Sequence, residues 1–179
     1  MLTRCLIANR GEIAVRIMRA CRELGMQTVA VYSDADAGAL FVSLADEAVA
    51  LGGAAPGESY LVTEKLIKVA LTTGCDCVHP GYGFLSENAA FAQAVMDAGL
   101  TWVGPPPEAI RLMGVKTQAR ALMEQANVPL ALGFASDSTA NAPFIEAAVR
   151  IGYPVMVKAA GGGGGKGIRI AHHPEELVP

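Results

Sequence analysis

The sequence has few charged side chains and no long apolar run. Charged residues account for 17% of the 179 residues and aromatic residues for 6%, whereas 52% are hydrophobic. The longest stretch without Lys, Arg, Asp or Glu is twelve residues, 125–136, and a membrane-spanning helix needs roughly 20. The first apolar run is broken at 9–11, too early for a secretory signal. These absences favour a globular protein with a sizeable core and no membrane partner.

Cysteine is scarce and does not form a recognisable motif. Cys5, Cys21, Cys75 and Cys77 include no C-x-x-C pair and no spacing typical of a zinc site. We therefore expect reduced thiols in a cytoplasmic protein rather than a disulfide framework.

The charge is modest and unevenly distributed. The net charge is −3, with 8 basic and 12 acidic residues in 1–113 but 6 basic and 5 acidic residues in 114–179. A nucleic-acid-binding protein usually carries a basic patch, so this balance predicts no nucleic-acid partner. The C-terminal segment is the part better suited to an anion.

Short β-branched runs alternate with helical periodicity, a pattern typical of an α/β protein with a parallel sheet. In the first part of the chain we expect strands at 2–8, 28–32, 48–51, 76–79 and 101–103, and helices at 12–24, 61–72 and 87–98. Ser86 is the expected cap of the last of these helices. Five such units make a complete small domain, which we place at 1–113.

The remainder, 114–179, reads as the beginning of a second domain. We expect helices at 107–113, 116–126 and 144–151, strands at 154–159 and 168–171, and the start of a helix after 172. So few elements bury too little surface to be stable alone.

The strongest motif is a run with six glycines among the seven residues 161–167. Glycines allow backbone N–H groups to approach phosphate oxygens closely. The run is not a Walker A loop, because Gly167 stands where Ser or Thr should follow Lys166. It is not a dinucleotide fingerprint either, because the residues after it alternate like a strand instead of opening a helix. The remaining interpretation is a glycine lid between two strands that covers phosphates.

Two lysines strengthen this interpretation. Lys158 ends an apolar strand just before the glycines, and Lys116 stands at the start of a predicted helix. A cation at a helix N-terminus opposes the helix dipole, so an anionic ligand would explain the position of Lys116, although a solvated surface lysine is the alternative.

Residues 79–88 (HPGYGFLSEN) lie between a predicted strand and a predicted helix. Ligands of open α/β sheets collect at such carboxyl ends of strands. A lone His79 is more often structural than catalytic, but the glycines on both sides of Tyr82 indicate a backbone held for close approach.

Together these segments resemble biotin carboxylase, the ATP-grasp component of acyl-CoA carboxylases and of pyruvate carboxylase. The resemblance runs over essentially the whole chain, in order, and its matching segments are 6–14 (LIANRGEIA), 79–88, 104–105, 110–114 (IRLMG) and Lys158 with the glycine run. It implies a Rossmann-like parallel-sheet domain followed by the start of an ATP-grasp domain. It further implies that Mg-ATP and bicarbonate form carboxyphosphate, which carboxylates carrier-bound biotin.

The resemblance also implies roles for particular residues. Tyr82 and Gly83 would lie near the bicarbonate and biotin end of the cleft, and the residues at the ATP phosphates would be Lys116, Lys158, Gly163, Gly164, Gly165 and Lys166. The family's catalytic arginine and Mg²⁺-binding carboxylates would come from beyond Pro179, so none is assigned within 1–179. The expected partners are a biotin carboxyl carrier domain and a carboxyltransferase, and dimerisation is common in bacterial members.

Three positions depart from the family pattern. Val115 replaces an acidic or polar residue, Phe41 replaces His, and Lys166 replaces a frequent Arg, which keeps the charge but loses the bidentate fork. Two alternatives stay open: a non-catalytic nucleotide-binding module, and another ATP-grasp ligase such as a carbamoyl-phosphate synthetase relative. The 79–88 block favours biotin carboxylase over the latter. We expect the 179-residue chain to be the N-terminal portion of the enzyme and inactive by itself.

Overall fold

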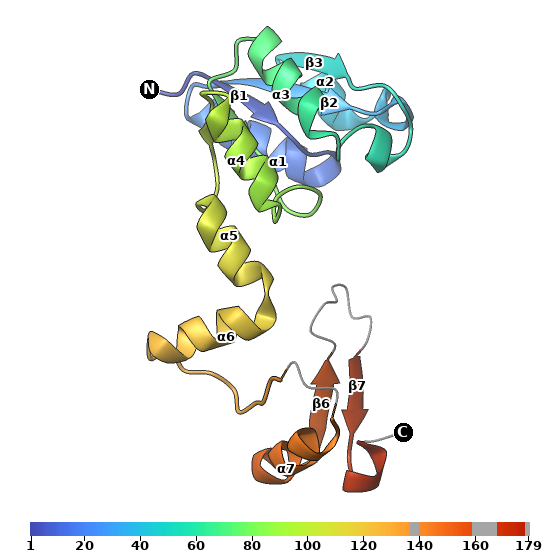
Figure 1. Ribbon diagram of the computed structural model, residues 1–179. Coiled ribbons are helices and arrows are strands. Elements are labelled where there is room, and N and C mark those ends of the chain that lie inside the picture. Colours follow the sequence, from blue (N-terminus) through green and yellow to red (C-terminus); the bar gives the residue numbers. More distant parts are fainter. Residues whose placement is uncertain (137–139, 159–167, 178–179) are drawn as a thin grey trace. The chain divides into compact units, whose positions relative to one another are not determined.

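A computed structural model describes residues 1–136, 140–158 and 168–177, without the side chains of Lys116 and Thr117. The chain divides into two compact units, Met1–Arg111 and Leu112–Pro179 (Figure 1). Each unit is described separately below. The glycine run 161–167 and its Lys166 lie outside the described residues.

The first unit contains a five-stranded parallel sheet, as the sequence predicts. Its strands follow the order β3-β2-β1-β4-β5, and all four neighbouring pairs are parallel. The strands are β1 (Arg4–Ile7), β2 (Gln27–Tyr32), β3 (Glu47–Ala50), β4 (Cys77–His79) and β5 (Thr101–Trp102). The chain builds outward in one direction from β1 to β3 and in the other from β4 to β5. The point where the order reverses, between β1 and β4, is where open α/β sheets usually bind ligands.

Helices cover both faces of this sheet (Figure 1). They are α1 (Gly11–Glu23), α2 (Leu40–Leu44), α3 (Thr63–Thr72) and α4 (Ala89–Asp97), with 3₁₀ turns η1 (Asp34–Asp36) and η2 (Pro56–Glu58) in the connections. Alternating strand residues supply the two cores, because successive side chains point to opposite faces. Leu6 packs on the α3 and α4 side, whereas Ile7 packs on the α1 and α2 side.

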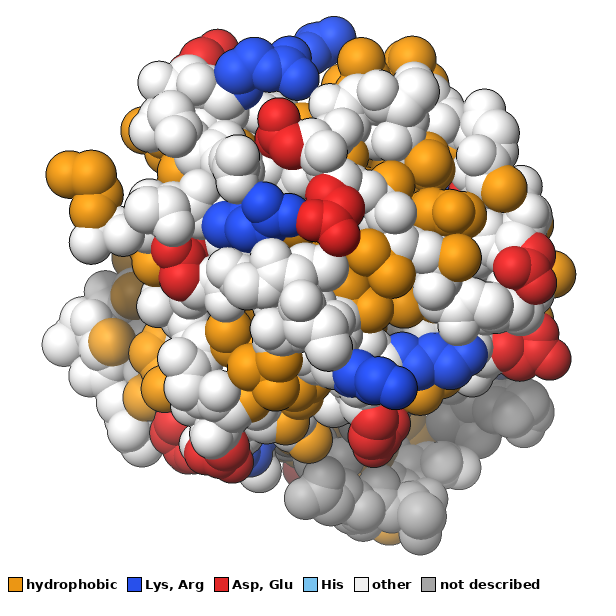
Figure 2. Space-filling model, turned by 90° about the horizontal axis from the view of Figure 1, so that it is seen from above, with side chains coloured by type: hydrophobic (Ala, Val, Ile, Leu, Met, Phe, Trp, Pro, Cys, Tyr) orange, Lys and Arg blue, Asp and Glu red, His pale blue; other side chains and the backbone are white. Residues whose placement is uncertain are grey.

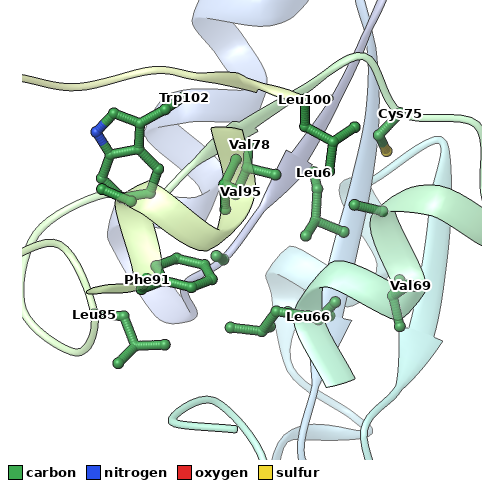
Figure 3. Close-up of a cluster of buried hydrophobic side chains, with 14 of the residues drawn as sticks. Leu6, Leu66, Val69, Cys75, Val78, Leu85, Phe91, Val95, Leu100 and Trp102 are labelled. Carbon is green, nitrogen blue, oxygen red and sulfur yellow. The ribbon is translucent and has the colours of Figure 1, made fainter. Parts of the chain in front are cut away.

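The larger core lies between the sheet and helices α3 and α4, and Figure 3 shows its side chains converging from both layers. Leu66 of α3 is fully buried and Phe91 of α4 is 1% exposed. The Phe91 ring meets the Trp102 indole edge to face, with centroids 5.5 Å apart. This geometry stabilises aromatic pairs beyond their buried area.

On the opposite face, three thiols lie together. Cys5 and Cys77 are paired in register on β1 and β4, and Cys21 of α1 packs in the same cluster. All four cysteines are buried free thiols. Hydrogen bonding to Cys21 and Cys77, together with burial, raises the pKa of Cys5 far above its usual range.

Two local predictions for the first unit need correction. Helix α4 begins at Ala89, not at Glu87, and its cap is Asn88 rather than Ser86, because the Asn88 side chain accepts the Phe91 N–H at 3.0 Å. Ser86 belongs to the preceding turn, where its N–H donates to the Gly83 carbonyl. Helix α2 was not predicted, since its five residues show too little periodicity.

The second unit contains an antiparallel hairpin of β6 (Val155–Lys158) and β7 (Ile168–Ala171). Its helices are α6 (Lys116–Gln125) and α7 (Ala142–Ile151), while α5 (Pro107–Gly114) spans the junction of the units. Both strands and these three helices match the predicted positions. No helix among the described residues is long and apolar enough to cross a membrane.

The helix expected after 172 is only a 3₁₀ turn, η3 (Pro174–Glu176). Its backbone bonds run from the Glu176 N–H to the His173 carbonyl and from the Leu177 N–H to the Pro174 carbonyl, both at 3.1 Å, and two side chains add to them. Arg169 Nη2 donates to the carbonyl oxygens of Glu176 and Leu177 at 2.7 and 2.8 Å, and the Glu176 carboxylate accepts the His172 N–H at 2.7 Å.

Candidate functional site

The loop that follows β4 has an unusual backbone. Gly81 and Gly83 have φ values of 66° and 69°, and Phe84 has φ of 44°. The left-handed region is costly for a residue with a side chain such as Phe84. Backbone strain of this kind persists only where the surroundings hold it, and it concentrates at functional sites.

Asn9, directly after β1, holds the first half of this loop. Its Nδ2 donates to the carbonyl oxygens of Pro80 at 2.7 Å and Tyr82 at 2.8 Å. Its Oδ1 accepts the N–H of Arg10 at 2.8 Å, which fixes the orientation of the amide. Asn9 is 3% exposed. Both of its N–H donors are therefore committed to the loop, on either side of Gly81.

This contact continues the pairing of β1 with β4. The Ala8 N–H donates to the His79 carbonyl at 2.9 Å, and the Asn9 side chain binds the carbonyls of Pro80 and Tyr82 beyond it. Gly81 must remain small, because a Cβ there would lie 2.8 Å from Asn9 Nδ2 and 3.0 Å from Ile13 Cγ1. The side chain of Asn9 and the 80–82 backbone thus fill the point where the strand order reverses.

A buried polar network holds the other end of the loop. The Phe84 ring stacks on Tyr60 with centroids 5.2 Å apart. The Tyr60 hydroxyl donates to Asp36 Oδ2 at 2.5 Å, and the Arg10 guanidinium makes a two-pronged ion pair with the same carboxylate. The hydrogen bond from Arg10 holds the pKa of Asp36 down at about 2.

Tyr82 stands between these two anchors with its ring in solvent. Its side chain is 61% exposed, and its hydroxyl donates to Glu12 Oε2 at 2.8 Å. That hydrogen bond raises the pKa of Tyr82, so the phenol stays protonated. The space beside Gly83 is open, since no described residue except its two chain neighbours comes within 4 Å of where its Cβ would be. A ligand could approach the backbone there.

His79 supports the turn at Gly81. Its Nδ1 accepts the Gly81 N–H at 3.0 Å, and burial lowers the pKa of its imidazole, which favours the neutral form that can accept. The structural interpretation of this histidine holds.

The predicted phosphate ligands belong to the second unit. Lys158 is the last residue of β6 and its side chain is exposed. Lys116 begins α6 after the cap residue Val115, as expected for the backbone. Its side chain lies outside the described part of the chain, as do Gly163, Gly164, Gly165 and Lys166. The structure therefore brings Tyr82 and Gly83 together in one unit, whereas Lys116 and Lys158 belong to the other.

The surface charges are mixed. On the face shown in Figure 2, Lys and Arg side chains are interspersed with Asp and Glu. Two exposed or partly exposed arginines are paired with acids, Arg4 with Glu47 and Arg111 with Glu108. The absence of a nucleic-acid partner stays a prediction.

Two known families match the chain, one in each part of it. Residues 1–110 match the family described as "Biotin carboxylase, N-terminal domain". Residues 115–179 match "Carbamoyl-phosphate synthase L chain, ATP binding domain". The second match explains why a carbamoyl-phosphate synthetase relative was a reasonable alternative.

The chain is also similar to complete proteins. It is 53% identical to biotin carboxylase 1 of Bacillus subtilis over 99% of its own length and 40% of that protein. It is 53% identical to the alpha subunit of mitochondrial methylcrotonoyl-CoA carboxylase of Oryza sativa, over 97% of the chain and 24% of that protein. The biotin carboxylase domain of Hydrogenobacter thermophilus 2-oxoglutarate carboxylase, a dimer in complex with MgADP, ADP and bicarbonate, superposes with a TM-score of 0.89 at 45% identity, covering 99% of this chain and 39% of that one.

These matches define first a class: a parallel-sheet domain joined to an ATP-binding domain, as in ATP-dependent ligases. Within that class, the chain belongs to the biotin carboxylase family. It spans about 40% of the length of the biotin carboxylase that it matches.

Sequence reasoning gave no role to Asn9, Glu12 or Asp36. Asn9 and Glu12 were recognised only as parts of the 6–14 segment. An Asn at the carboxyl end of a buried strand was a usable signal, because loops from neighbouring parallel strands meet there. The role of Asp36 could not be predicted from the sequence, since its partners Arg10 and Tyr60 are distant in sequence.

Proposed function

We propose that this chain supplies the N-terminal part of an ATP-dependent biotin carboxylase, which uses Mg-ATP and bicarbonate to carboxylate biotin on a carrier domain. The observation that carries the proposal is the 53% identity to biotin carboxylase 1 over nearly the whole chain. The solved relative named above binds MgADP and bicarbonate. The domains are proposed as 1–113 and 114–179.

Within this proposal, Lys158 and Lys116 contact the ATP phosphates. Lys158 ends a strand with its side chain exposed, immediately before the glycine segment, so its ammonium is accessible to an anion. ATP supplies the phosphoryl group that activates bicarbonate. The proposed lid consists of Gly163, Gly164, Gly165 and Lys166, and the Mg²⁺ ligands are proposed outside 1–179.

Tyr82 and Gly83 are proposed at the bicarbonate and biotin end. The open space beside Gly83 and the exposed, protonated phenol of Tyr82 support that role. Because the Tyr82 proton is donated to Glu12, the phenol oxygen can accept a hydrogen bond from a ligand N–H or O–H.

The test is bicarbonate-dependent ADP release with Mg-ATP and free biotin. The enzyme is a chimera in which this chain replaces the matching N-terminal part of the Bacillus subtilis enzyme. Lys158→Ala should lower kcat/KM for ATP about thirtyfold, the equivalent of one charge-assisted hydrogen bond of about 2 kcal/mol. The 179-residue chain alone should give no turnover.

Lys68→Ala is the matched control, because Lys68 is an exposed lysine on α3 in the first unit. It should leave kcat/KM for ATP unchanged. An equal loss in both variants would contradict the phosphate role of Lys158, and clear turnover by the isolated chain would contradict the division of the catalytic groups.

The partners and the location are part of the same proposal. We infer a biotin carboxyl carrier domain and a carboxyltransferase as partners, supported by the similarity to the methylcrotonoyl-CoA carboxylase subunit. A homodimer is supported by the dimeric domain of the thermophilic relative. A cytoplasmic location is supported by the bacterial relative.

A further inference from the structure

The β1–α1 junction makes two separate contacts with the loop that carries Tyr82 and Gly83. Asn9 binds the backbone on both sides of Gly81, at Pro80 and Tyr82. Glu12, in the first turn of α1, binds the Tyr82 hydroxyl. One contact fixes where the loop runs, and the other fixes where the Tyr82 ring points.

The two contacts differ in burial, which separates their effects. Asn9 is 3% exposed, so its hydrogen bonds have no competition from water. Tyr82 is 61% exposed, and its hydroxyl is held by the hydrogen bond to Glu12. Asn9 is a buried clamp, by which we mean that its two hydrogen bonds fix the loop backbone. The exposed Glu12 carboxylate selects one orientation of the Tyr82 side chain, which would otherwise sample several.

The position of Glu12 suits this task. It lies at the start of α1, where a carboxylate is stabilised by the helix dipole. Its Oε2 accepts the Tyr82 hydroxyl proton at 2.8 Å, which directs that proton toward α1.

We propose that Asn9 and Glu12 are positioning residues of the biotin carboxylase site, which hold Tyr82 and Gly83 in place for a substrate that donates a hydrogen bond. The inference rests on the proposed function, which places Tyr82 and Gly83 at the bicarbonate and biotin end. In many α/β proteins the junction after the first strand binds the ligand directly. Here the junction after β1 binds the 80–83 loop of the protein itself, so that Asn9 and Glu12 act on the substrate through Tyr82 and Gly83.

The clamp is tested first in the 179-residue chain by amide hydrogen exchange. Asn9→Asp keeps the size of the side chain but removes both N–H donors. Exchange across 81–85 should accelerate about tenfold or more, as expected when two buried hydrogen bonds are lost. Asn127→Asp, the same change at a residue of the second unit with φ of 54°, should leave 81–85 unchanged. Unchanged protection in a folded Asn9→Asp chain overturns the clamp.

Glu12 is tested independently, which keeps the proposal open to refutation if Asn9→Asp does not fold. In chains with ¹³C-labelled tyrosine rings, Glu12→Ala should lower the Tyr82 pKa toward its ordinary value, and the ring signals of Tyr32 and Tyr153 at neutral pH should not move. Glu12→Gln keeps an acceptor oxygen and should retain the ring position. An unchanged Tyr82 signal in Glu12→Ala overturns the role of Glu12.

The catalytic consequence is measured in the chimeric enzyme. Asn9→Asp and Glu12→Ala should raise KM for bicarbonate or biotin about tenfold, with KM for ATP changed by less than about twofold, and Glu12→Gln should restore most of the loss. Equal changes in all three KM values indicate a merely structural role and overturn the proposal.

The two levels of failure can be told apart. If the unsubstituted chimera turns over but the variants shift no KM, the positioning inference fails and the proposed function stands. If the unsubstituted chimera shows no bicarbonate-dependent ADP release, the proposed function fails, while the exchange and tyrosine measurements still decide whether Asn9 and Glu12 hold the loop.

Discussion

The two units contain the same kind of aromatic contact but bury it very differently. In the first unit Phe91 and Trp102 meet edge to face at 5.5 Å, and in the second Phe134 and Phe144 do so at 5.4 Å. Phe91 is 1% exposed, whereas Phe134 is 38% exposed. A sheet covered on both faces encloses its aromatic pair, while a hairpin with one helix beside it leaves its pair in contact with water.

The strands show the same difference. The central strands β1 and β2 of the first unit supply buried residues to both cores. In the second unit, Met156, Ile168 and Ile170 of the hairpin are 53%, 45% and 50% exposed, and the buried residues among those described are Ala147, Ala148 and Ala171. Contact geometry alone therefore does not indicate stability, because the energy of burial depends on the area removed from water.

The largest expected effect comes from removing one ring of each pair. Phe91→Ala should lower the free energy of unfolding by about 3–5 kcal/mol, since it leaves a cavity in a closed core. Phe134→Ala should cost about 1 kcal/mol, close to the value of the ring contact itself. Urea denaturation followed by circular dichroism measures both. Similar losses would mean that the second unit buries its aromatic pair as effectively as the first.

The next effect distinguishes two glycines of the same loop. Gly83→Ala should cost about 1 kcal/mol, the penalty for a side chain at positive φ. Gly81→Ala has nearly the same φ but also pushes against Asn9 Nδ2, so it should cost about 2–3 kcal/mol through the lost hydrogen bonds. Thermal unfolding of the two variants measures the difference. Equal losses would contradict close packing between Gly81 and Asn9.

A pH titration compares the units through their carboxylates. The pKa of Asp36 in the first unit is lowered from 3.8 to about 2, chiefly by Arg10. A lowered pKa means that the stabilisation is present above the unfolded value and is lost as the pH falls from about 4 toward 2. Asp36→Asn should remove this dependence and cost about 2 kcal/mol at neutral pH.

Glu176 in the second unit is the control for this titration. Its pKa is also lowered, by the His172 N–H, but the residue is exposed. Glu176→Gln should leave the acid dependence of unfolding nearly unchanged. A large change would show that exposed carboxylates of the second unit also contribute to acid stability.

The smallest effect concerns His79. Burial lowers the pKa of its imidazole, and the neutral ring accepts the Gly81 N–H at Nδ1. The stabilisation from this hydrogen bond is therefore fully present above the ordinary histidine pKa. It is lost as the pH falls through the lowered pKa. Amide exchange at Gly81, corrected for the intrinsic pH dependence, should accelerate below that value, and His79→Phe should show no such step. No step in the unsubstituted chain would contradict this contact.

The fold was largely predictable because its signals are local and periodic. The alternation of strands and helices in the first 110 residues predicted the parallel sheet, and only the boundaries, the cap of α4 and the short helix α2 differed. The segment after 172 was predicted as the start of a helix, whereas the described residues form a 3₁₀ turn there, with the Arg169 side chain bound to the carbonyl oxygens of Glu176 and Leu177.

The sequence by itself determined the strand and helix order and, through its motifs, the family. The roles that the family resemblance implies for Lys116, Lys158, Tyr82 and Gly83 stay predictions. Tertiary structure alone decided which residues support Tyr82. Asn9 and Glu12 reach the 80–83 loop from 70 or more positions away, because the parallel pairing of β1 with β4 brings the carboxyl ends of the two strands together. Residue spacing along the chain does not predict these contacts, since the register of a sheet is set by the burial of its two faces.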